Sequence, residues 1–297
     1  MSGQPRTGRV ITRFGAEMVV EDDDGQLHRC TSRRRLEHAV CGDRVHWEPT
    51  TSGNDVVTNL LPRHNALTRP DLRGRPKAVA ANIDQLIVVS AYRPEPNWEM
   101  VDRYLVAAAL LPAAAVIVLN KADLRPSEDP AADTVEEYRR IGYPVLTTSI
   151  PQDHGIEALE AACVGKTSIL VGLSGVGKSS LIKALLPDQE VRIGEISEAI
   201  EKGRHTTTNA TLYHLPTGGD LIDSPGVRDF ELGAVEPRDL ARGFLEFADA
   251  AQSCRFHDCT HSVEPSCGVK AAVENGQISA RRYRSYRLLL DARRAAG

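Results

Sequence analysis

Three sequence patterns follow one another along the 297 residues and together predict three domains. Short strand-like runs come first, then β-branched runs alternate with helical stretches, and a compact group of cysteines and histidine comes last. Closely spaced short strands indicate a small closed barrel, for which the OB-fold is the common form. Strands alternating with helices indicate a parallel α/β sheet. We therefore expect an OB-fold β-barrel (1–65), an α/β domain (66–235) and a helical zinc-binding domain (236–297).

Turn residues separate the runs that we assign to the barrel. Arg residues balance Asp and Glu in this part, so its charge does not indicate an RNA-binding surface. The run Arg33–Arg35 has two interpretations, a phosphate contact or a solvated loop, and the sequence does not separate them. The expected strands are Gly8–Phe14, Glu17–Val20, Gln26–Cys30, Arg44–Trp47 and Val56–Leu61.

The middle part alternates strands with helices. The apolar stretch from Leu105 to Leu119 is too short to span a bilayer, and Pro112 divides it into a helix end and a strand. A helix is expected at Lys178–Leu186. The expected strands are Gln85–Ser90, Ala115–Leu119, Pro144–Thr148, Thr167–Val171, Ala210–Leu215 and Asp220–Ile222.

A phosphate-binding loop of the form G-x-x-x-x-G-K-[ST] follows the strand Thr167–Val171 directly. Backbone N–H groups and the helix N-terminus wrap nucleotide phosphates in such loops. Lys178 would reach the β/γ oxygens, and the Ser179 hydroxyl would ligate Mg²⁺. The residues expected to contact nucleotide are Gly172, Leu173, Ser174, Gly175, Val176, Gly177, Lys178, Ser179 and Ser180.

A base-recognition motif, N-K-x-D, precedes this loop at Asn120, Lys121, Ala122 and Asp123. The Asp123 carboxylate can accept hydrogen bonds from the N1–H and 2-amino group of guanine, and adenine lacks that donor pair. Ser149 closes a strand where the remaining guanine loop would lie, although Ile150 replaces the usual alanine. Because ordinary GTPases carry the phosphate loop first, the order predicts a circularly permuted P-loop GTPase domain. Such permutation is tolerated because chain termini usually lie close together at the surface.

Two further segments fit the sensing of γ-phosphate. The threonine cluster in 203–208 offers Thr207 and Thr208 as magnesium ligands, and D-x-P-G offers Asp223 for Mg²⁺ and the Gly226 N–H for γ-phosphate. The residue after Gly226 is Val227, which cannot orient water as glutamine does in Ras-like proteins. His205 is our candidate for that catalytic role, and a solvated switch-loop histidine is the alternative. Gly175 replaces the asparagine that accompanies potassium in some glutamine-less GTPases.

The C-terminal part contains Cys254, Cys259, His261 and Cys267 with the spacing C-x₄-C-x-H-x₅-C. A Cys₃His set suits tetrahedral Zn²⁺, and His257 is an alternative imidazole. We expect one structural zinc ion per chain. The three other cysteines, Cys30, Cys41 and Cys163, are expected to be buried as small apolar side chains.

The net charge of −4 hides two basic segments. One runs from Arg63 to Lys77 and the other, with six arginines, from Arg281 to Arg294. Each fits either a solvated face or contact with a phosphodiester backbone. The N-terminus shows no signal peptide pattern, so we expect a cytoplasmic, membrane-free monomer.

These motifs resemble those of the circularly permuted RsgA/YjeQ family of small-ribosomal-subunit assembly GTPases. The resemblance covers nearly the whole chain and implies GTP hydrolysis to GDP stimulated by the 30S subunit, a role in its late maturation, and contacts of barrel and zinc domain with 16S rRNA. The segments that carry it are NKAD at 120–123, GLSGVGKSS at 172–180, GRHTTT at 203–208, DSPGVRDF at 223–230 and CRFHDCTHSVEPSC at 254–267.

Two other classes of function are compatible with parts of the sequence. A P-loop kinase or ATPase is disfavoured by N-K-x-D, and nucleotide competition would separate it. A nucleotide-gated RNA-binding protein with little turnover is compatible with Val227.

Because D-x-P-G lies next to the zinc domain in sequence, connectivity suggests that nucleotide state moves the zinc domain more directly than the barrel.

Overall fold

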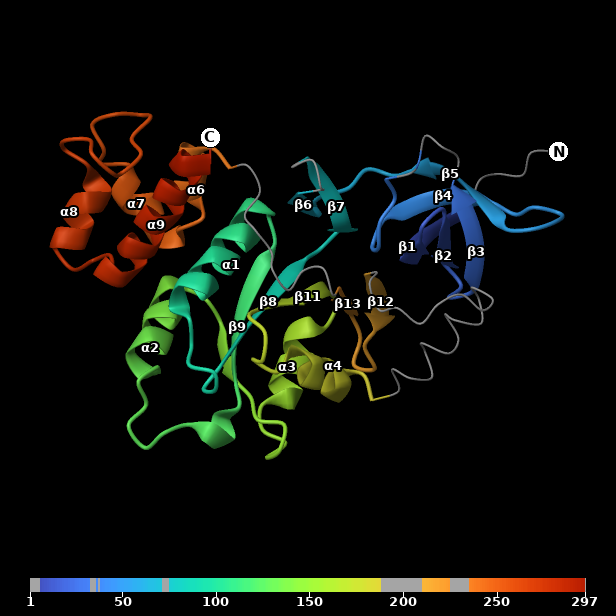
Figure 1. Cartoon of the computed structure of the whole chain (residues 1–297), viewed down its shortest axis with the longest axis horizontal. Helices are drawn as coiled ribbons and strands as arrows, with labels where there is room; N and C mark the ends of the chain where they lie inside the picture. Colours follow the sequence, from blue (N-terminus) through green and yellow to red (C-terminus); the bar gives the residue numbers. More distant parts are fainter. Residues whose placement is uncertain are drawn as a thin grey trace.

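The computed structural model describes residues 6–32, 36, 38–70, 75–187, 210–224 and 235–296. Figure 1 shows three parts in a row, with the barrel at one end, the α/β sheet in the middle and the C-terminal helices at the other end. The architecture confirms the predicted fold class.

The N-terminal part is a closed five-stranded barrel. Strand β1 pairs with β2 and with β4, and β2 pairs with β3. Strand β5 pairs in parallel with β3 and antiparallel with β4, which closes the ring. Val10, Met18 and Trp47 fill its interior. The strands are β1 (Arg6–Phe14), β2 (Glu17–Asp22), β3 (Leu27–Ser32), β4 (Arg44–Glu48) and β5 (Asp55–Leu60).

The basic segment after the barrel contains a hairpin that the sequence did not predict. Strands β6 (Ala66–Pro70) and β7 (Pro76–Ala81) form a separate two-stranded sheet. Arg69 lies opposite Lys77 in this hairpin. Arg63, at the start of the same segment, instead pairs with the buried carboxylate of Asp43 at 2.6 Å.

The central sheet has the strand order β10-β9-β8-β11-β13-β12, and all neighbouring strands are parallel except the β12–β13 pair. Helices α1 and α2 pack on one face, and α3 and α4 pack on the other. The strands are β8 (Gln85–Ala91), β9 (Ala114–Asn120), β10 (Val145–Thr147), β11 (Thr167–Val171), β12 (Thr211–His214) and β13 (Asp220–Asp223). The helices are α1 (Trp98–Leu110), the short 3₁₀ helix η2 (Ala122–Leu124), α2 (Ala132–Ile141), α3 (Ile156–Cys163) and α4 (Lys178–Leu185).

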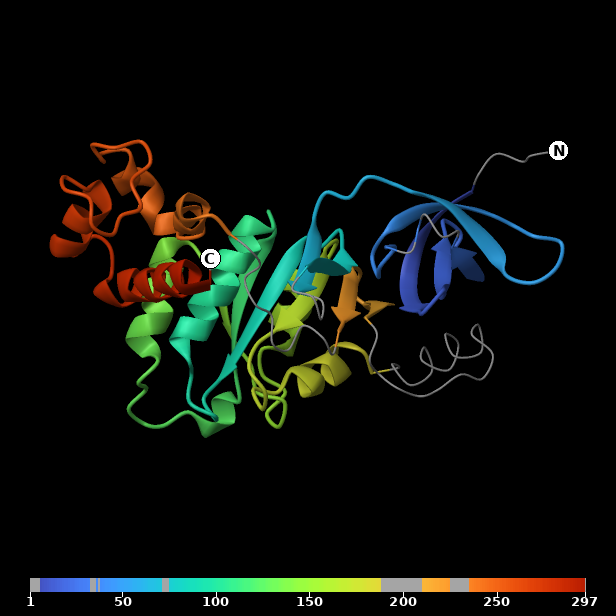
Figure 2. The same cartoon turned by 45° about the horizontal axis from the view of Figure 1, so that its top comes forward.

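The barrel and the α/β domain share one continuous sheet. Strand β1 pairs antiparallel with β12 at Thr12 and Thr211. Within the described residues, the two parts therefore form one sheet of eleven strands. Figure 2 shows β12 and β13 beside the barrel. Chain connectivity alone places the barrel far from the elements that follow the phosphate loop, but this pairing brings it into direct contact with one of them.

The C-terminal helices pack around Phe244, Phe247 and Tyr286, and Val106 of α1 reaches into the same apolar cluster. Helix α9 contacts both α1 and α6 (Figures 1 and 2). The helices are α6 (Pro237–Arg242), η4 (Leu245–Phe247), α7 (Ala248–Ala251), α8 (Gly268–Glu274) and α9 (Ala280–Ala296).

A buried ion-pair cluster joins α9 to α1 and α2. Arg282 donates to Asp102 at 2.7 Å and to Glu246 at 2.6 Å, and Arg281 donates to Asp102 at 2.9 Å. The Tyr138 hydroxyl also donates to Asp102. Two arginines of the predicted basic segment 281–294 therefore stabilise the interior and are not free to contact phosphate, because they find acidic partners far away in sequence.

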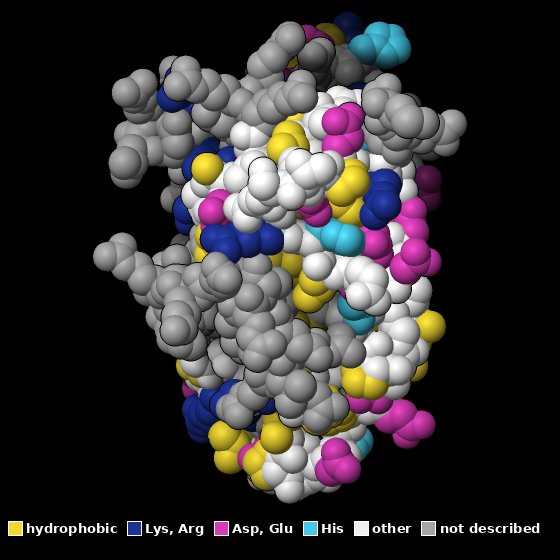
Figure 3. All heavy atoms as spheres, turned by 90° about the vertical axis from the view of Figure 1, so that its right-hand side faces the viewer, with side chains coloured by type: hydrophobic (Ala, Val, Ile, Leu, Met, Phe, Trp, Pro, Cys, Tyr) yellow, Lys and Arg dark blue, Asp and Glu magenta, His cyan; other side chains and the backbone are white. Residues whose placement is uncertain are grey.

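The outer surface of the barrel end is mixed in charge. Figure 3 shows Lys and Arg, Asp and Glu, and several histidines on this face, rather than a surface of one sign. No helix within the described ranges is both long enough and apolar enough to cross a membrane.

Candidate nucleotide and metal sites

The predicted nucleotide motifs meet at one edge of the central sheet. Because β9, β10, β11 and β13 belong to a parallel set with β8, their carboxyl ends lie on the same side. Asn120 ends β9, Gly172 follows β11 and Asp223 ends β13. Ligands of open α/β sheets bind at this edge. The fold thus brings the base motif and the phosphate loop together in spite of their reversed order.

The phosphate loop has a backbone that only glycine accommodates at its two ends. Gly172 has φ +150°, and an added Cβ would lie 2.2 Å from the Val89 carbonyl oxygen. Gly177 has φ +99°, and an added Cβ would lie 2.3 Å from Asn120 Nδ2. The loop therefore packs directly on the strand β8 and on the N-K-x-D asparagine, and its conformation requires these glycines.

Two residues of N-K-x-D hold the phosphate loop from the side. Asn120 Nδ2 donates to the Val176 carbonyl at 2.9 Å, and Lys121 Nζ donates to the Gly175 carbonyl at 2.7 Å. Asn120 is buried, and its Oδ1 accepts a hydrogen bond from the Thr148 hydroxyl at 2.9 Å. Thr148 directly precedes Ser149 at the strand end where the sequence predicts the remaining guanine loop.

Asp123 and Ser149 come from different strand ends and touch one another. The Ser149 hydroxyl donates to Asp123 Oδ1 at 2.6 Å, and Ser149 itself is buried. A backbone hydrogen bond joins the same two segments, since the Ala122 N–H donates to the Thr148 carbonyl at 3.0 Å. One carboxylate oxygen of Asp123 is thus oriented by protein.

Lys178 lies at the start of α4 and points back over its own loop. Its Nζ donates to the carbonyls of Gly172 and Leu173, each at 2.7 Å. Ser174, Ser179 and Ser180 are exposed at the same loop and helix start. The predicted residues His205, Thr207, Thr208 and Gly226 lie outside the described ranges.

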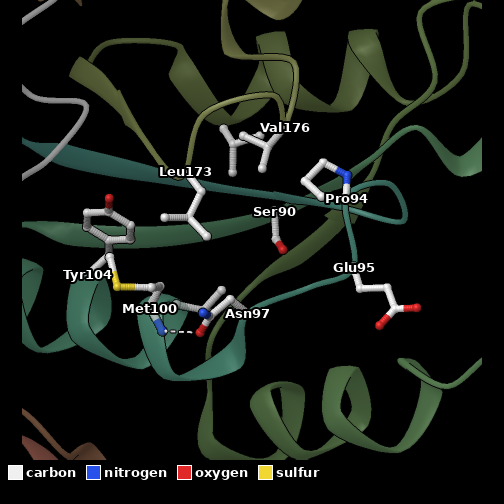
Figure 4. A pocket seen from close by; sticks show the side chains of 10 residues that line it. Ser90, Pro94, Glu95, Asn97, Met100, Tyr104, Leu173 and Val176 are labelled. Carbon is white, nitrogen blue, oxygen red and sulfur yellow. Dashed lines mark hydrogen bonds between the residues drawn. The ribbon is translucent and has the colours of Figure 1, made fainter.

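A small apolar pocket lies beneath the phosphate loop. Figure 4 shows Leu173 and Val176 of the loop pointing toward Met100 and Tyr104 of α1. Asn97 is the N-cap of α1, and its side chain accepts a hydrogen bond from the Met100 N–H at 3.0 Å. The side chains of the loop therefore rest on the helix whose other residues contact the C-terminal part.

The four predicted metal ligands come together in the C-terminal part. The sulfur atoms of Cys254 and Cys267 are 3.8 Å apart, and each lies 3.5 Å from His261 Nδ1. All four ligand atoms, including that of Cys259, lie within 4.8 Å of one another. A tetrahedral ion with bonds of about 2.0–2.3 Å needs ligand atoms about 3.3–3.8 Å apart, so the group fits a metal ion.

Local contacts and burial suit these side chains to metal binding. Glu264 accepts hydrogen bonds from the Thr260 and Ser262 N–H groups, both at 2.9 Å, and so folds the loop around His261. Burial lowers the pKa of His261, which favours the neutral imidazole that ligates metals. Burial raises the pKa of the Cys259 thiol to about 12, so a thiolate there requires the charge of a bound cation.

The remaining cysteines are buried as expected. Cys30 lies in β3, Cys41 precedes β4 and Cys163 ends α3, and all three are free thiols. Desolvation by burial raises the pKa of each.

Comparison with known proteins identifies a family for this chain. The family model described as RsgA GTPase matches residues 60–233. The small ribosomal subunit biogenesis GTPase RsgA of Chromohalobacter salexigens is 49% identical over 97% of this chain and 86% of its own length. The protein of the same name from Azotobacter vinelandii is 46% identical over the same shares.

Two solved structures have the same architecture. YjeQ from Thermotoga maritima superposes with a TM-score of 0.81 at 36% identity, covering 97% of this chain and 98% of that one. YloQ, described as a circularly permuted GTPase, gives a TM-score of 0.80 at 26% identity over 99% and 96% of the two chains. With the family model covering more than half of it, the chain belongs to the RsgA GTPase family.

Proposed function

We propose that this protein hydrolyses GTP and acts on the small (30S) ribosomal subunit during its late maturation. The observation that carries the proposal is the contact between the two nucleotide motifs, in which Asn120 and Lys121 hold the carbonyls of the phosphate loop. Similarity over nearly the whole chain to named subunit biogenesis GTPases supports the ribosomal partner. The deciding experiment compares GTP turnover with and without purified 30S particles.

Guanine selection is assigned to Asp123, with Ser149 orienting it. Asp123→Asn removes the charged acceptor, and hydrogen bonds to charged groups contribute about 1.5–3 kcal/mol, so GTP affinity should fall at least about tenfold and preference should shift toward xanthosine nucleotides. Asp153→Asn, in the exposed loop after β10, is the matched control. Unchanged GTP binding by Asp123→Asn would contradict the base assignment.

Phosphate and magnesium binding are assigned to the loop amides, Lys178 and Ser179, with Asp223, Thr207 and Thr208 completing the Mg²⁺ site. Lys178→Ala and Ser179→Ala should each abolish turnover because they remove the phosphate cation and a metal ligand. GDP binding should survive Ser179→Ala better. Lys183→Ala, at an exposed position later in α4, serves as control. Retained hydrolysis in either test variant would contradict this site.

Hydrolysis should be slow in the free protein because Val227 cannot orient water. An intrinsic rate on the order of 10⁻⁴–10⁻³ s⁻¹ is expected, with stimulation by orders of magnitude on the particle. His205→Ala should lose most of this stimulation and keep GTP affinity. Negligible turnover in both conditions would instead support the nucleotide-gated RNA-binding protein.

The metal is assigned as zinc, with one structural ion per chain held by Cys254, Cys259, His261 and Cys267. Cys259→Ala should lower zinc content in elemental analysis and loosen the C-terminal part while nucleotide binding persists. Cys163→Ala removes a buried thiol in α3 and is the control. Unchanged zinc content across replacements of the three cysteine ligands would exclude the site.

The domain bounds 1–65, 66–235 and 236–297 complete the proposal, with the barrel and the zinc domain contacting 16S rRNA. The exposed residues Arg69, Arg75 and Lys77 of the β6–β7 hairpin support contact with phosphate. Binding to the particle should then depend strongly on salt, and sedimentation with 30S particles at increasing ionic strength measures it.

A further inference from the structure

The barrel holds the start of strand β12. The buried Thr12 of β1 donates its hydroxyl to the Ala210 carbonyl at 3.0 Å. The Thr211 hydroxyl in turn donates to Thr12 Oγ1 at 3.2 Å. Ala210 follows the predicted magnesium ligand Thr208 by only two positions in sequence. The barrel therefore forms hydrogen bonds with the chain directly after the predicted switch segment 203–208.

The barrel also holds the opposite end of the β12–β13 hairpin. His214 Nε2 lies 2.7 Å from Glu21 of β2, and His214 Nδ1 lies 2.6 Å from Asp220 of β13. Hydrogen bonds to Asp220 and then Glu21 raise the pKa of His214 to about 9, so at neutral pH the imidazolium bridges two carboxylates from different domains.

Arg9 of β1 contacts the first residues of two strands that end at the nucleotide site. Its guanidinium pairs with Asp220, which begins β13, and donates to the hydroxyl of Thr167, which begins β11, at 2.7 Å. Burial would raise the pKa of Asp220, but His214 and Arg9 outweigh it and lower that pKa. Strand β13 runs from Asp220 to Asp223, a length of about 10 Å.

These contacts connect both ends of the hairpin to the barrel. Both the start of β12 and the turn region of the hairpin are bonded to barrel residues, while the carboxyl end of β13 carries Asp223. A rotation of the barrel would therefore pull on a strand whose other end belongs to the predicted magnesium site.

We propose that the barrel is a positioning element for GTP hydrolysis: Thr12, Arg9 and Glu21 fix the β12–β13 hairpin, and RNA of the small subunit bound to the barrel alters turnover through it. This inference rests on the proposed function and concerns its regulation. Coupling between two sites is reciprocal for binding free energies. The nucleotide bound at the sheet edge should therefore change the protection of barrel strand β1.

The test uses the full chain with Arg9→Ala and Glu21→Ala, singly and together. The matched controls are Arg29→Ala and Glu17→Ala, which break an ion pair of 2.9 Å inside the barrel. Three measurements are made on each: kcat and KM for GTP with and without 30S particles, cosedimentation with those particles, and amide hydrogen exchange of residues 6–14 with GDP or a non-hydrolysable GTP analogue.

Arg9→Ala and Glu21→Ala, the variants at the junction between the barrel and the β12–β13 hairpin, should keep particle binding and KM. They should lose 30S-stimulated kcat by about three- to thirtyfold, the range for residues that couple two sites. Their nucleotide-dependent difference in β1 exchange should disappear, whereas the controls should retain both. A merely structural role would not separate kcat from KM in this way. Junction variants that match the controls in stimulated kcat and in exchange would overturn the proposal.

Failure of the proposed function has a different result. If 30S particles do not stimulate GTP turnover by the wild-type protein, the proposed ribosomal role is contradicted. The exchange measurement still tests the junction in that case, because it needs nucleotide alone. Equal β1 exchange with GDP and the GTP analogue in wild-type protein would then overturn the coupling as well.

Discussion

The two junctions that flank the α/β domain are both built from ion pairs, but they differ in burial. On the side of the C-terminal helices, Arg282 and its partner Asp102 have side chains with no exposed surface. On the barrel side, Arg9 and Asp220 are 20% and 17% exposed, and His214 is 43% exposed. Solvent therefore reaches the charges of the barrel junction, whereas it is excluded from the central Arg282–Asp102 pair of the other junction.

This difference in burial determines how strongly each junction keeps its geometry. A buried ion pair that loses one partner leaves an uncompensated charge, so its geometry is strongly preferred. Partly exposed pairs contribute less, and water can replace a lost partner. We interpret the C-terminal junction as rigid and the barrel junction as adjustable.

The elements at each junction also differ. The buried cluster joins α9 to helices α1 and α2, which lie on one face of the sheet. The barrel junction joins β1 and β2 to strands β12 and β13, and β13 ends at Asp223. Each junction therefore reaches the nucleotide site through one element. Helix α1 carries Asp102 and lines the pocket beneath the phosphate loop, and β13 carries Asp220 and Asp223.

The largest expected effect follows from Arg282→Ala. It leaves Asp102 and Glu246 without their main cation, so the C-terminal part should lose about 3–5 kcal/mol of stability. Urea unfolding monitored by Trp98, whose ring lies 5.8 Å from that of Tyr138, measures this loss when Trp47 is replaced by phenylalanine. Arg284→Ala, on an exposed position of the same helix, is the control. Equal losses in both variants would refute the rigid junction.

A smaller effect is expected from Tyr138→Phe. Burial and the Asp102 charge raise the pKa of Tyr138, so its hydroxyl stays protonated and donates to that carboxylate. Removing one hydrogen bond to a charged group should cost about 1.5–3 kcal/mol in the same Trp98 assay. Tyr92→Phe removes a comparable bond to Asp129 away from the junction and should spare the Trp98 transition.

Arg9→Ala should destabilise the barrel junction by less than about 1 kcal/mol, because its pair is partly exposed. The loss should shrink further as salt is added, since exposed charges are screened. Unfolding followed by Trp47 at low and high ionic strength measures it. A loss as large as that of Arg282→Ala, and insensitive to salt, would show that the two junctions do not differ in this way.

The smallest effect concerns pH and His214→Gln. Because the pKa of His214 is raised to about 9 in the folded state, its contribution is fully present below the unfolded value of about 6.5. The contribution is lost as pH rises through about 9. The wild-type melting temperature should exceed that of the variant at pH 6, and the gap should close above pH 9. A gap that is constant with pH would exclude a protonated bridge between Glu21 and Asp220, the carboxylate with which Arg9 also pairs.

Much of the secondary structure and the metal site could be predicted from local sequence patterns. Strand β11 begins and ends where expected, at Thr167 and Val171, because buried β-branched runs and the following glycine loop define it without distant partners. The four metal ligands could be found because their spacing is short and their chemistry is specific. The hairpin β6–β7 was missed because a run of arginines and prolines indicates a linker more readily than a strand.

The sequence by itself determined the three architectural parts, the reversed order of the nucleotide motifs and the ligand set of the metal site. Tertiary structure alone decided that Arg282 is buried against Asp102 and that Thr12 meets Thr211. The physical reason is that a charge or a strand edge carries no local sign of its partner. Which arginine finds a carboxylate, and which strand completes a sheet, depends on residues some 180 to 200 positions apart that only the packed fold brings together.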